Sequence, residues 1–200
     1  DMASYLQSAI RGYRNIIVSG ATNSGKTSLM RALLEPACAV DRLFVIEDTR
    51  ELRLPIKRGV SHEITAGNQA SLEMVDSLKT ALRSAPDRLV IGEIRDSKSL
   101  LAYLEALEAG FRGGITSMHA PSARGAMWRA VRFLQRTGLF AMAEPYIDMV
   151  FSNIDLVVHC ARCEDKQYRV LEIAEIHDDE INLMFAWDQE KGRFVRKGVV

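Results

Sequence analysis

Residues 20–27 read Gly20-Ala21-Thr22-Asn23-Ser24-Gly25-Lys26-Thr27, which matches the pattern G-x-x-x-x-G-K-[ST]. A short β-branched run at 16–18 precedes this stretch, and a segment with helical patterning follows it. A loop of this kind between a strand and a helix binds phosphate, because its glycines let backbone amides close around phosphate oxygens. The helix adds the positive end of its dipole. The stretch therefore predicts a nucleotide-binding P-loop within an α/β fold.

The other apolar runs predict a mainly parallel sheet that is flanked by helices. The runs at 43–46 and 89–91 are short and β-branched and lack the alternation of a half-exposed strand, so we expect strands buried on both faces. Helical patterns follow at 72–82, 100–107 and 127–134. Strands that alternate with helices are typical of a parallel sheet covered on both sides. We therefore predict a RecA-like P-loop NTPase fold.

The C-terminal segment, from about 153 to 200, has a different pattern. Strand-like stretches at 155–161, 168–176 and 181–187 are separated by polar turns, and a further turn and short strand are expected at 191–195. Because no helical pattern separates these stretches, we expect antiparallel strands that extend one edge of the sheet. The prediction is a single domain over 1–200 in which this segment is the antiparallel extension.

Composition favours a cytoplasmic protein. Acidic and basic residues balance at 26 each, and neither a signal peptide nor a long apolar run is present. The three cysteines do not form a disulfide framework. His159, Cys160 and Cys163 lie close together, but a closed zinc site needs four ligands and there is no second C-x-x-C pair. We therefore assign no metal other than Mg²⁺.

Acidic residues follow the two central apolar runs at the point where each run ends. Glu47, Asp48 and Glu51 follow the run at 43–46, and Glu93 follows the run at 89–91. A carboxylate in this position beside a P-loop can hold Mg²⁺ through water or orient the attacking water. We expect Glu93 to polarise the hydrolytic water, since it would face the γ-phosphate.

His119 ends a short strand-like run that follows the glycine pair at 113–114. In an open parallel sheet, ligands bind outside the carboxyl ends of the strands. Gly20, Glu47, Glu93 and His119 each lie at that end of a predicted strand, so we expect all four to converge on one crevice. In that position His119 would sense the γ-phosphate through a hydrogen bond and pass its loss to neighbouring elements.

The order of these motifs resembles that of the type II and type IV secretion ATPases, a superfamily that includes pilus motors and conjugation or effector-export ATPases. The family's Walker A loop, Asp box, Walker B motif and His box match 20–27, 46–52, 89–93 and 110–119. The sequence at 46–52 looks closest to the type IV secretion and tight-adherence branches. Two departures stand out. Gly110-Phe111 replaces the family's usual Gly-His, and the family's N-terminal domain is not part of this sequence.

The resemblance implies ATP and Mg²⁺ as ligands and assigns roles by position. Lys26 is expected to contact the β- and γ-phosphates, and the Thr27 hydroxyl to bind Mg²⁺, with Asp48 as a second metal residue. The catalytic residues are expected to be Glu93, Glu47, Glu51 and His119. The nucleotide-binding residues are expected to be Gly20, Ala21, Thr22, Asn23, Ser24, Gly25, Lys26, Thr27 and Ser28.

The resemblance further implies a homohexamer at the cytoplasmic face of the bacterial inner membrane, with secretion or pilus machinery as partners, only peripheral membrane contact and no direct nucleic-acid binding. Because the chain begins close to its main motif, we expect it to be a fragment. Two alternatives stay open on the sequence alone: a nucleotide-gated interaction module that does not hydrolyse ATP, and a nucleic-acid translocase. Neutral charge and the lack of a basic run with interleaved aromatics weigh against the second.

Overall fold

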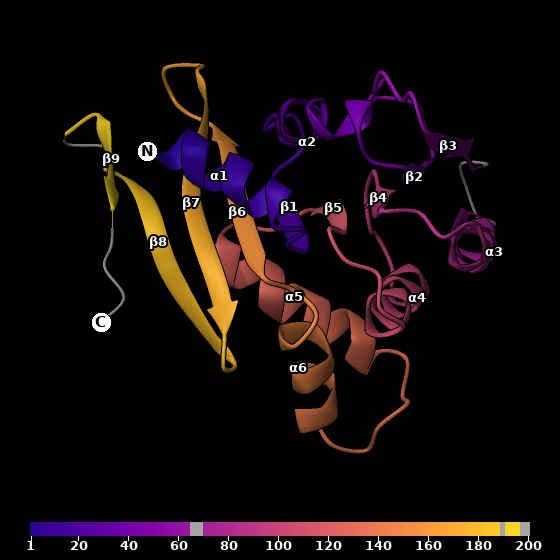
Figure 1. Ribbon diagram of the computed structural model, residues 1–200. Helices are drawn as coiled ribbons and strands as arrows, with labels where there is room; N and C mark the ends of the chain where they lie inside the picture. The colour runs from indigo at the N-terminus through magenta and orange to yellow at the C-terminus, as the bar shows by residue number, and fades with distance from the viewer. Residues whose placement is uncertain (65–69, 189–190, 197–200) are drawn as a thin grey trace.

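The computed structural model describes residues 1–64, 70–188 and 191–196 (Figure 1). The strands are β1 Ile16–Gly20, β2 Leu43–Glu47, β3 Gly59–Glu63, β4 Arg88–Ile91, β5 Ile115–Met118, β6 Leu156–Arg162, β7 Tyr168–His177, β8 Glu180–Asp188 and β9 Arg193–Arg196. The helices are α1 Met2–Arg11, α2 Lys26–Leu34, the 3-10 turn η1 Ala37–Ala39, α3 Ala70–Ser84, α4 Ser97–Glu108, α5 Ala123–Gln135 and α6 Glu144–Phe151. No helix in the described part of the chain has the length and apolar character that a membrane span requires.

All of the described strands form one sheet in the order β3-β2-β4-β5-β1-β6-β7-β8-β9. Strands β3, β2, β4, β5, β1 and β6 pair in parallel, and β6 through β9 pair antiparallel. This confirms the predicted α/β fold with antiparallel C-terminal strands. The predicted strands at 155–161, 168–176 and 181–187 and the short final strand at 193–195 are confirmed as β6, β7, β8 and β9. The parts of the predicted extension at 189–190 and 197–200 lie outside the described residues.

The first strand of the C-terminal segment joins the parallel part of the sheet to the antiparallel part. Strand β6 pairs in parallel with β1, with Gly20 opposite Cys160. The reason is that α5 and α6 carry the chain back from the end of β5 before β6 begins, so β6 enters the sheet in the direction of β1. Antiparallel pairing begins at the far edge of β6, where β7 joins it through a short turn.

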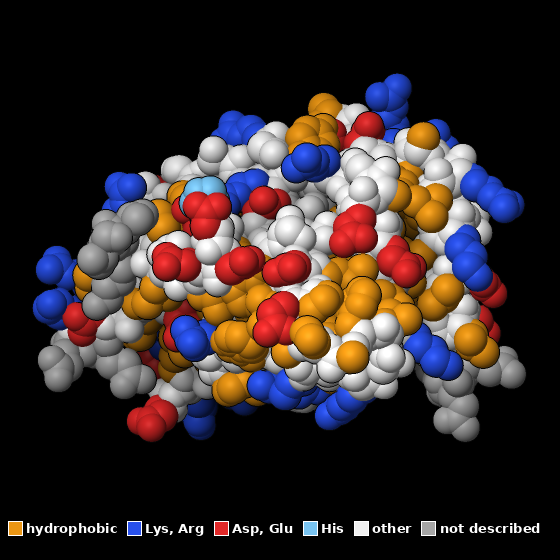
Figure 2. Space-filling model, turned by 90° about the horizontal axis from the view of Figure 1, so that it is seen from below, with side chains coloured by type: hydrophobic (Ala, Val, Ile, Leu, Met, Phe, Trp, Pro, Cys, Tyr) orange, Lys and Arg blue, Asp and Glu red, His pale blue; other side chains and the backbone are white. Residues whose placement is uncertain are grey.

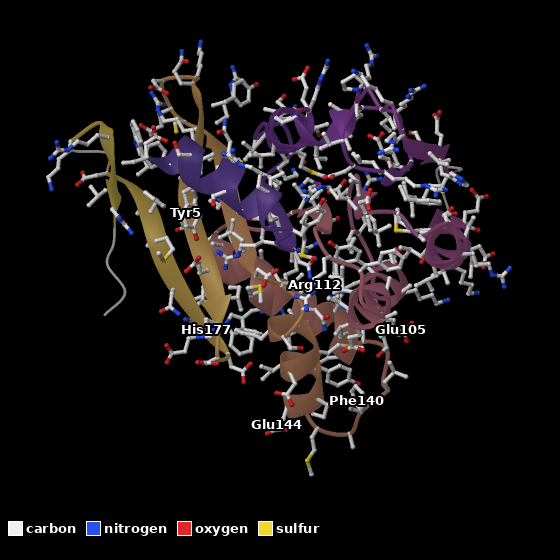
Figure 3. All side chains as sticks on the ribbon, viewed as in Figure 1. Tyr5, Glu105, Arg112, Phe140, Glu144 and His177 are labelled. Atoms are coloured by element: carbon white, nitrogen blue, oxygen red, sulfur yellow. The ribbon has the colours of Figure 1, made fainter. Side chains whose placement is uncertain are left out.

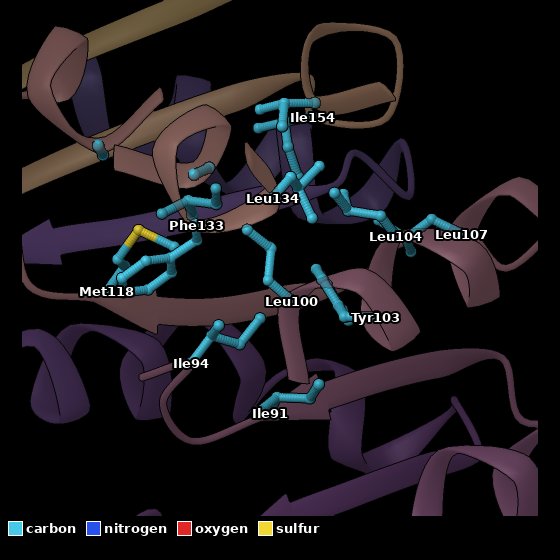
Figure 4. Packing of buried hydrophobic residues seen from close by; sticks show 14 of the residues in the cluster. Ile91, Ile94, Leu100, Tyr103, Leu104, Leu107, Met118, Phe133, Leu134 and Ile154 are labelled. Atoms are coloured by element: carbon cyan, nitrogen blue, oxygen red, sulfur yellow. The ribbon is translucent and has the colours of Figure 1, made fainter. Parts of the chain in front are cut away.

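The sheet separates two apolar layers. Side chains alternate between the faces of a strand, so in β1 Ile17 points into one layer and Ile16 and Val18 into the other. Helices α3, α4, α5 and α6 cover the first layer, and α1 and α2 cover the second. Figure 4 shows the packing in the first layer, where Leu100 and Tyr103 of α4 lie near Ile91 of β4. Burial of one large apolar side chain contributes about 1.5–3 kcal/mol, and the two layers hold the sheet rigid beneath its carboxyl ends.

The end of the molecule opposite those carboxyl ends carries both acidic and apolar side chains. Phe140, in the loop before α6, and Glu144, the first residue of α6, lie at the lower end in Figure 3. Figure 2 views this end and shows acidic and hydrophobic side chains interspersed over the face. Leu139, Phe140 and Met142 in the loop before α6 are all exposed. None of these residues is among the predicted site residues, which lie at the opposite edge of the sheet.

Candidate active site

The loop from β1 to α2 has a backbone that requires glycine at two positions. Gly25 adopts φ +90°, and a Cβ at Gly20 would lie 2.3 Å from the carbonyl oxygen of Cys160 and 2.3 Å from the Ser24 hydroxyl. Gly25 is also the N-cap of α2, and no side chain caps the first amides of that helix. The buried Ser24 Oγ has no hydrogen-bond partner within the described residues. The loop therefore presents unpaired donors at a helix N-terminus, which is an arrangement that suits phosphate.

Lys26 lies folded against this loop. Its side chain is 8% exposed, and Nζ donates to the carbonyl oxygens of Ala21 at 2.8 Å and Gly20 at 3.3 Å. Loss of hydration on burial lowers the pKa of the lysine, and the negative charge of Glu93 opposes that effect. The ammonium group is therefore placed at the loop and incompletely solvated, so an anionic ligand would stabilise its charged form.

Glu47 organises the segment that follows β2. Its Oε1 accepts hydrogen bonds from the backbone amides of Glu51 at 3.1 Å and Leu52 at 2.9 Å, and burial raises the pKa of this carboxyl group. The turn held in this way places Glu51 Oε2 3.2 Å from Thr27 Oγ1, which donates to it. Glu51 is therefore the carboxylate that lies beside the Thr27 hydroxyl, the group predicted to bind Mg²⁺.

Glu93 lies between Arg95 and His119. Its Oε2 accepts from Arg95 Nε at 2.7 Å, and its Oε1 lies 2.8 Å from His119 Nε2. The second contact is close, but Oε1 is buried and forms no hydrogen bond within the described residues, so it retains accepting capacity. Arg95 also forms an ion pair with Asp48. Asp48 is therefore directed at Arg95, whereas Glu51 is directed at Thr27.

His119 contacts three parts of the site. Besides Glu93, its Nδ1 lies 3.2 Å from the carbonyl oxygen of Gly20 and 3.4 Å from Lys26 Nζ. Nδ1 can donate to the carbonyl or accept from the ammonium group, and it cannot do both at once. A change at the phosphate end of the loop would therefore reach Glu93 through this one imidazole.

These residues surround one cavity of about 660 Å³ at the carboxyl ends of β1, β5, β4 and β2. The predicted residues that line it are Thr22, Asn23, Ser24, Gly25, Lys26, Thr27, Ser28, Glu47, Asp48, Glu51, Glu93 and His119. Gly20 and Ala21 do not line the cavity, and their carbonyl groups hold Lys26 from behind. The described residues contain no cluster of three or more His, Cys, Asp or Glu side chains arranged to hold a metal ion.

Sequence reasoning missed one wall of the cavity. Cys160 of β6 and Tyr168, Arg169 and Val170 of β7 line it together with Leu29 of α2. No motif marks these positions. The available signal was the polar turn at 163–167, which joins two strand-like stretches, but locating it next to the P-loop required the parallel pairing of β6 with β1 that the sequence did not suggest.

Comparison with known proteins agrees with the motif order. The model of the "Type II/IV secretion system protein" family matches residues 1–192. The chain belongs to the type II/IV secretion system protein family. The predicted resemblance to this family is thereby confirmed.

Individual members of the type II/IV secretion family give the same result. The type IV secretion system protein VirB11 of Bartonella quintana is 33% identical, and the match covers 86% of this chain and 49% of that protein. The conjugal transfer protein TrbB of Rhizobium radiobacter is also 33% identical, over 87% of this chain and 52% of that protein. The chain thus spans about half the length of these curated relatives. The crystal structure of the VirB11 ATPase from the Brucella suis type IV secretion system, in complex with sulphate, superposes with a TM-score of 0.77 at 30% identity and covers 88% of this chain and 52% of that one.

Proposed function

We propose that this member of the type II/IV secretion family is the ATP-hydrolysing motor domain of a secretion, conjugation or pilus-assembly ATPase. The observation that carries the proposal is the convergence of the P-loop, Glu93 and His119 on one cavity at the carboxyl edge of the sheet. The curated relatives are named as type IV secretion and conjugal transfer proteins, and the Brucella relative is named as an ATPase. The description of the Brucella relative as an ATPase agrees with this chemistry.

The residues present fit ATP with Mg²⁺. The uncapped start of α2, the unpaired Ser24 hydroxyl and the Lys26 ammonium group supply donors and charge for phosphate oxygens. Thr27 and the neighbouring acids Glu51 and Asp48 are oxygen ligands of the kind that Mg²⁺ takes, directly or through water, in P-loop sites. When bound, Mg²⁺ would neutralise charge on the β- and γ-phosphates.

In the proposed reaction water attacks the γ-phosphorus and ADP leaves. Glu93 Oε1, which is buried and has accepting capacity to spare, orients that water. Lys26 offsets the charge that develops on the transferred group. His119 lies between Lys26 and Glu93, so loss of the γ-phosphate would alter its contacts on both sides. Glu47 holds the turn that presents Glu51, and we assign it a positioning role.

For the whole protein we propose a homohexamer at the cytoplasmic face of the inner membrane, with secretion or pilus machinery as its partners. We further propose that 1–200 acts as one RecA-like domain. In such a ring, hydrolysis would move domains against one another and exert force on the partner proteins. These proposals rest on family membership, because the chain spans only about half the length of its relatives.

The test is steady-state ATP hydrolysis with Mg²⁺ by the wild-type chain, Glu93→Gln and Lys26→Ala, with ATP affinity measured by calorimetry on the same samples. We expect Glu93→Gln to bind ATP normally and to turn over about a hundredfold more slowly. Lys26→Ala should lose about tenfold or more in affinity. The matched control is Glu105→Gln, which changes an exposed acid at the end of the molecule away from the site (Figure 3) and should behave as wild type.

One observation favours a second candidate, a nucleotide-gated module that does not hydrolyse ATP. Arg95 donates to Glu93 Oε2, and Oε1 is buried with His119 Nε2 2.8 Å away, so Oε1 is not exposed to solvent in this conformation. Tight ATP binding with no turnover in the wild type, and no change in Glu93→Gln, would support the gated module and exclude the hydrolytic motor. Absence of ATP binding would exclude both.

A further inference from the structure

The hairpin that joins β6 to β7 extends past the end of the P-loop strand. Gly20, the last residue of β1, lies opposite Cys160, and β6 continues for two more residues to Arg162. Tyr168 opens β7 directly opposite Arg162. A register shift between His159 and Cys160 marks the point where the hairpin passes the strand end, and such irregularities re-aim side chains next to active sites. The tip of this hairpin therefore stands beside the phosphate-binding loop.

The hairpin is held in place by its own contacts. Arg169 forms a two-pronged ion pair with Asp165, with N–O distances of 2.7 and 2.5 Å. The backbone amides of Gln167 and Lys166 donate to Asp165 Oδ1 at 3.0 Å and to the Cys163 carbonyl oxygen at 2.9 Å. A ligand group that docks on this hairpin would meet a surface that is already ordered, which lowers the entropic cost of binding.

Tyr168 presents its ring to the cavity. A Cβ placed on Gly25 would lie 3.3 Å from Tyr168 Cδ1, so the ring packs close against the last glycine of the P-loop. The residue is nevertheless 57% exposed and lines the cavity together with Val170 and Leu29. The Arg162 guanidinium lies over the ring, 5.7 Å from its centre. An aromatic ring that keeps part of its surface open to a ligand cavity is suited to stack on a nucleotide base.

The cavity has two chemically different ends, which orient a nucleotide. Glu93, His119 and Arg95 flank one end, where the proposed hydrolysis would require the γ-phosphate. Tyr168 and Val170 lie on the other side of β1, where Leu29 and Arg169 also line the cavity. If Lys26 holds the triphosphate and the γ-phosphate lies beside Glu93, the nucleoside extends toward Tyr168. We propose that Tyr168 stacks on the base of the bound nucleoside triphosphate, an inference that rests on the proposed function.

The experiment compares two probes, ATP and inorganic tripolyphosphate, which carries the phosphate chain without a base. Calorimetry with Mg²⁺ measures the affinity of wild type, Tyr168→Leu and Tyr168→Phe for each probe. We expect Tyr168→Leu to lose about tenfold in affinity for ATP while keeping its affinity for tripolyphosphate within about twofold. Tyr168→Phe retains the ring and should bind both probes as wild type does. Phe140→Leu, an exposed aromatic at the opposite end, is the matched control (Figure 3).

Four other results of this experiment would overturn the inference about Tyr168. If Tyr168→Leu weakens ATP and tripolyphosphate equally, the ring supports the P-loop against Gly25 and does not stack on the base, which overturns the inference. An unchanged affinity of Tyr168→Leu for ATP overturns it as well. If the wild type binds neither probe, the proposed function fails, and the inference fails with it. Wild-type binding of both probes with equal affinity leaves the phosphate site in place but shows that the base makes no contact, which overturns the inference alone.

Discussion

His159 of β6 lies beside the P-loop strand, opposite Ser19 of β1, in a buried position where a charge would be costly. It is 6% exposed, and its Nδ1 lies 3.0 Å from the hydroxyl of the fully buried Ser19. Burial lowers the pKa of this histidine, Glu172 opposes the change and the positive charge of Lys26 reinforces it. Folding therefore favours the neutral imidazole, while the unfolded chain takes up a proton near the ordinary histidine pKa of about 6.5.

The sign of the pH effect follows from this difference. Below about pH 6.5 the unfolded state binds a proton that the folded state does not, so the free energy of unfolding decreases as the pH falls toward the lowered pKa. We expect His159→Asn, which retains a polar atom near the position of Nδ1, to lose less stability than wild type between neutral and mildly acidic pH. Urea unfolding at both pH values measures this. His177→Asn, at an exposed histidine, is the control, and equal acid losses in wild type and His159→Asn would show that folding does not lower the pKa of His159.

Comparing alanine substitutions at Gly25 and Gly138 distinguishes the effect of backbone strain from an effect on nucleotide binding. Both have positive φ, +90° and +68°, but a Cβ at Gly138 would meet no atom within 4 Å, whereas one at Gly25 would press on Tyr168. Alanine at either position should cost about 1–2 kcal/mol of unfolding free energy, because the left-handed region is unfavourable for it. Only Gly25→Ala should also weaken ATP binding, by about tenfold, since it disturbs the loop that cradles phosphate. Calorimetry and urea unfolding on both variants test this, and equal ATP affinities would count against the role assigned to the loop.

At the scale of elements, one buried ion pair joins three segments at the amino end of the sheet. Arg88, the first residue of β4, is 2% exposed and pairs with Asp41, which precedes β2. The same guanidinium donates to the Ile10 carbonyl oxygen of α1 at 2.7 Å and lies over the Tyr13 ring, 4.2 Å from its centre. Loss of either partner would leave a buried charge uncompensated.

We therefore expect Asp41→Asn to lower the free energy of unfolding by about 3–5 kcal/mol. Asp76→Asn removes the acid of an exposed pair with Lys79 and should cost at most about 1 kcal/mol. Urea unfolding of both variants makes the comparison, and the double variant Arg88→Met/Asp41→Asn should recover part of the loss because no charge remains buried. A cost for Asp41→Asn as small as that for Asp76→Asn would show that water reaches Arg88.

The elements that we predicted from the sequence bury apolar side chains in a regular pattern. The elements that we missed do not show such a pattern. The parallel strands β1, β2 and β4 are buried on both faces, so their apolar runs are visible in the sequence. Strand β3 is an exposed edge with the sequence Gly-Val-Ser-His-Glu and owes its place to backbone pairing with β2, which leaves no apolar pattern. Helices α1 and α6 were also missed. In α1, burial is confined to Leu6, Ala9 and Ile10, too few positions to establish a period.

At the scale of the whole molecule, the rule that ligands bind outside the carboxyl ends of parallel strands predicted most of the candidate site. It brought Glu47, Glu93 and His119 to the P-loop because each follows a strand of known direction. The rule could not predict which side chains of the site contact one another. Whether Thr27 faces Asp48 or Glu51 depends on the turn that Glu47 closes, and the wall at Tyr168 depends on the direction of β6. Both the contact of Thr27 and the wall at Tyr168 depend on contacts between residues far apart in the chain, and a single sequence gives little information on such contacts.

The charges around the cavity bear on how the whole protein would work. Three cationic side chains line it in the part of the chain that the structure describes: Lys26, Arg95 and Arg169. Arg95 is paired with Glu93 and Asp48, and Arg169 with Asp165. Lys26 alone among the three forms no ion pair in the described residues, and it donates to backbone carbonyls. One such cation with Mg²⁺ offers limited stabilisation to a phosphoryl group in transfer, for which many ATPases and GTPases recruit an arginine in trans, worth about 10³–10⁵ in rate.

We therefore expect turnover per chain to be slow at low protein concentration and to rise steeply as chains associate, because a neighbouring subunit would supply the missing positive charge. ATP hydrolysis measured across a concentration series, with molecular mass followed by sedimentation velocity on the same samples, tests this. ATP affinity should change far less than turnover, since Lys26 and the P-loop already hold the phosphates within one chain. Turnover per chain that stays constant while the mass rises would show that each chain carries a complete catalytic site. It would remove the main physical reason for a ring in which neighbours share the chemistry.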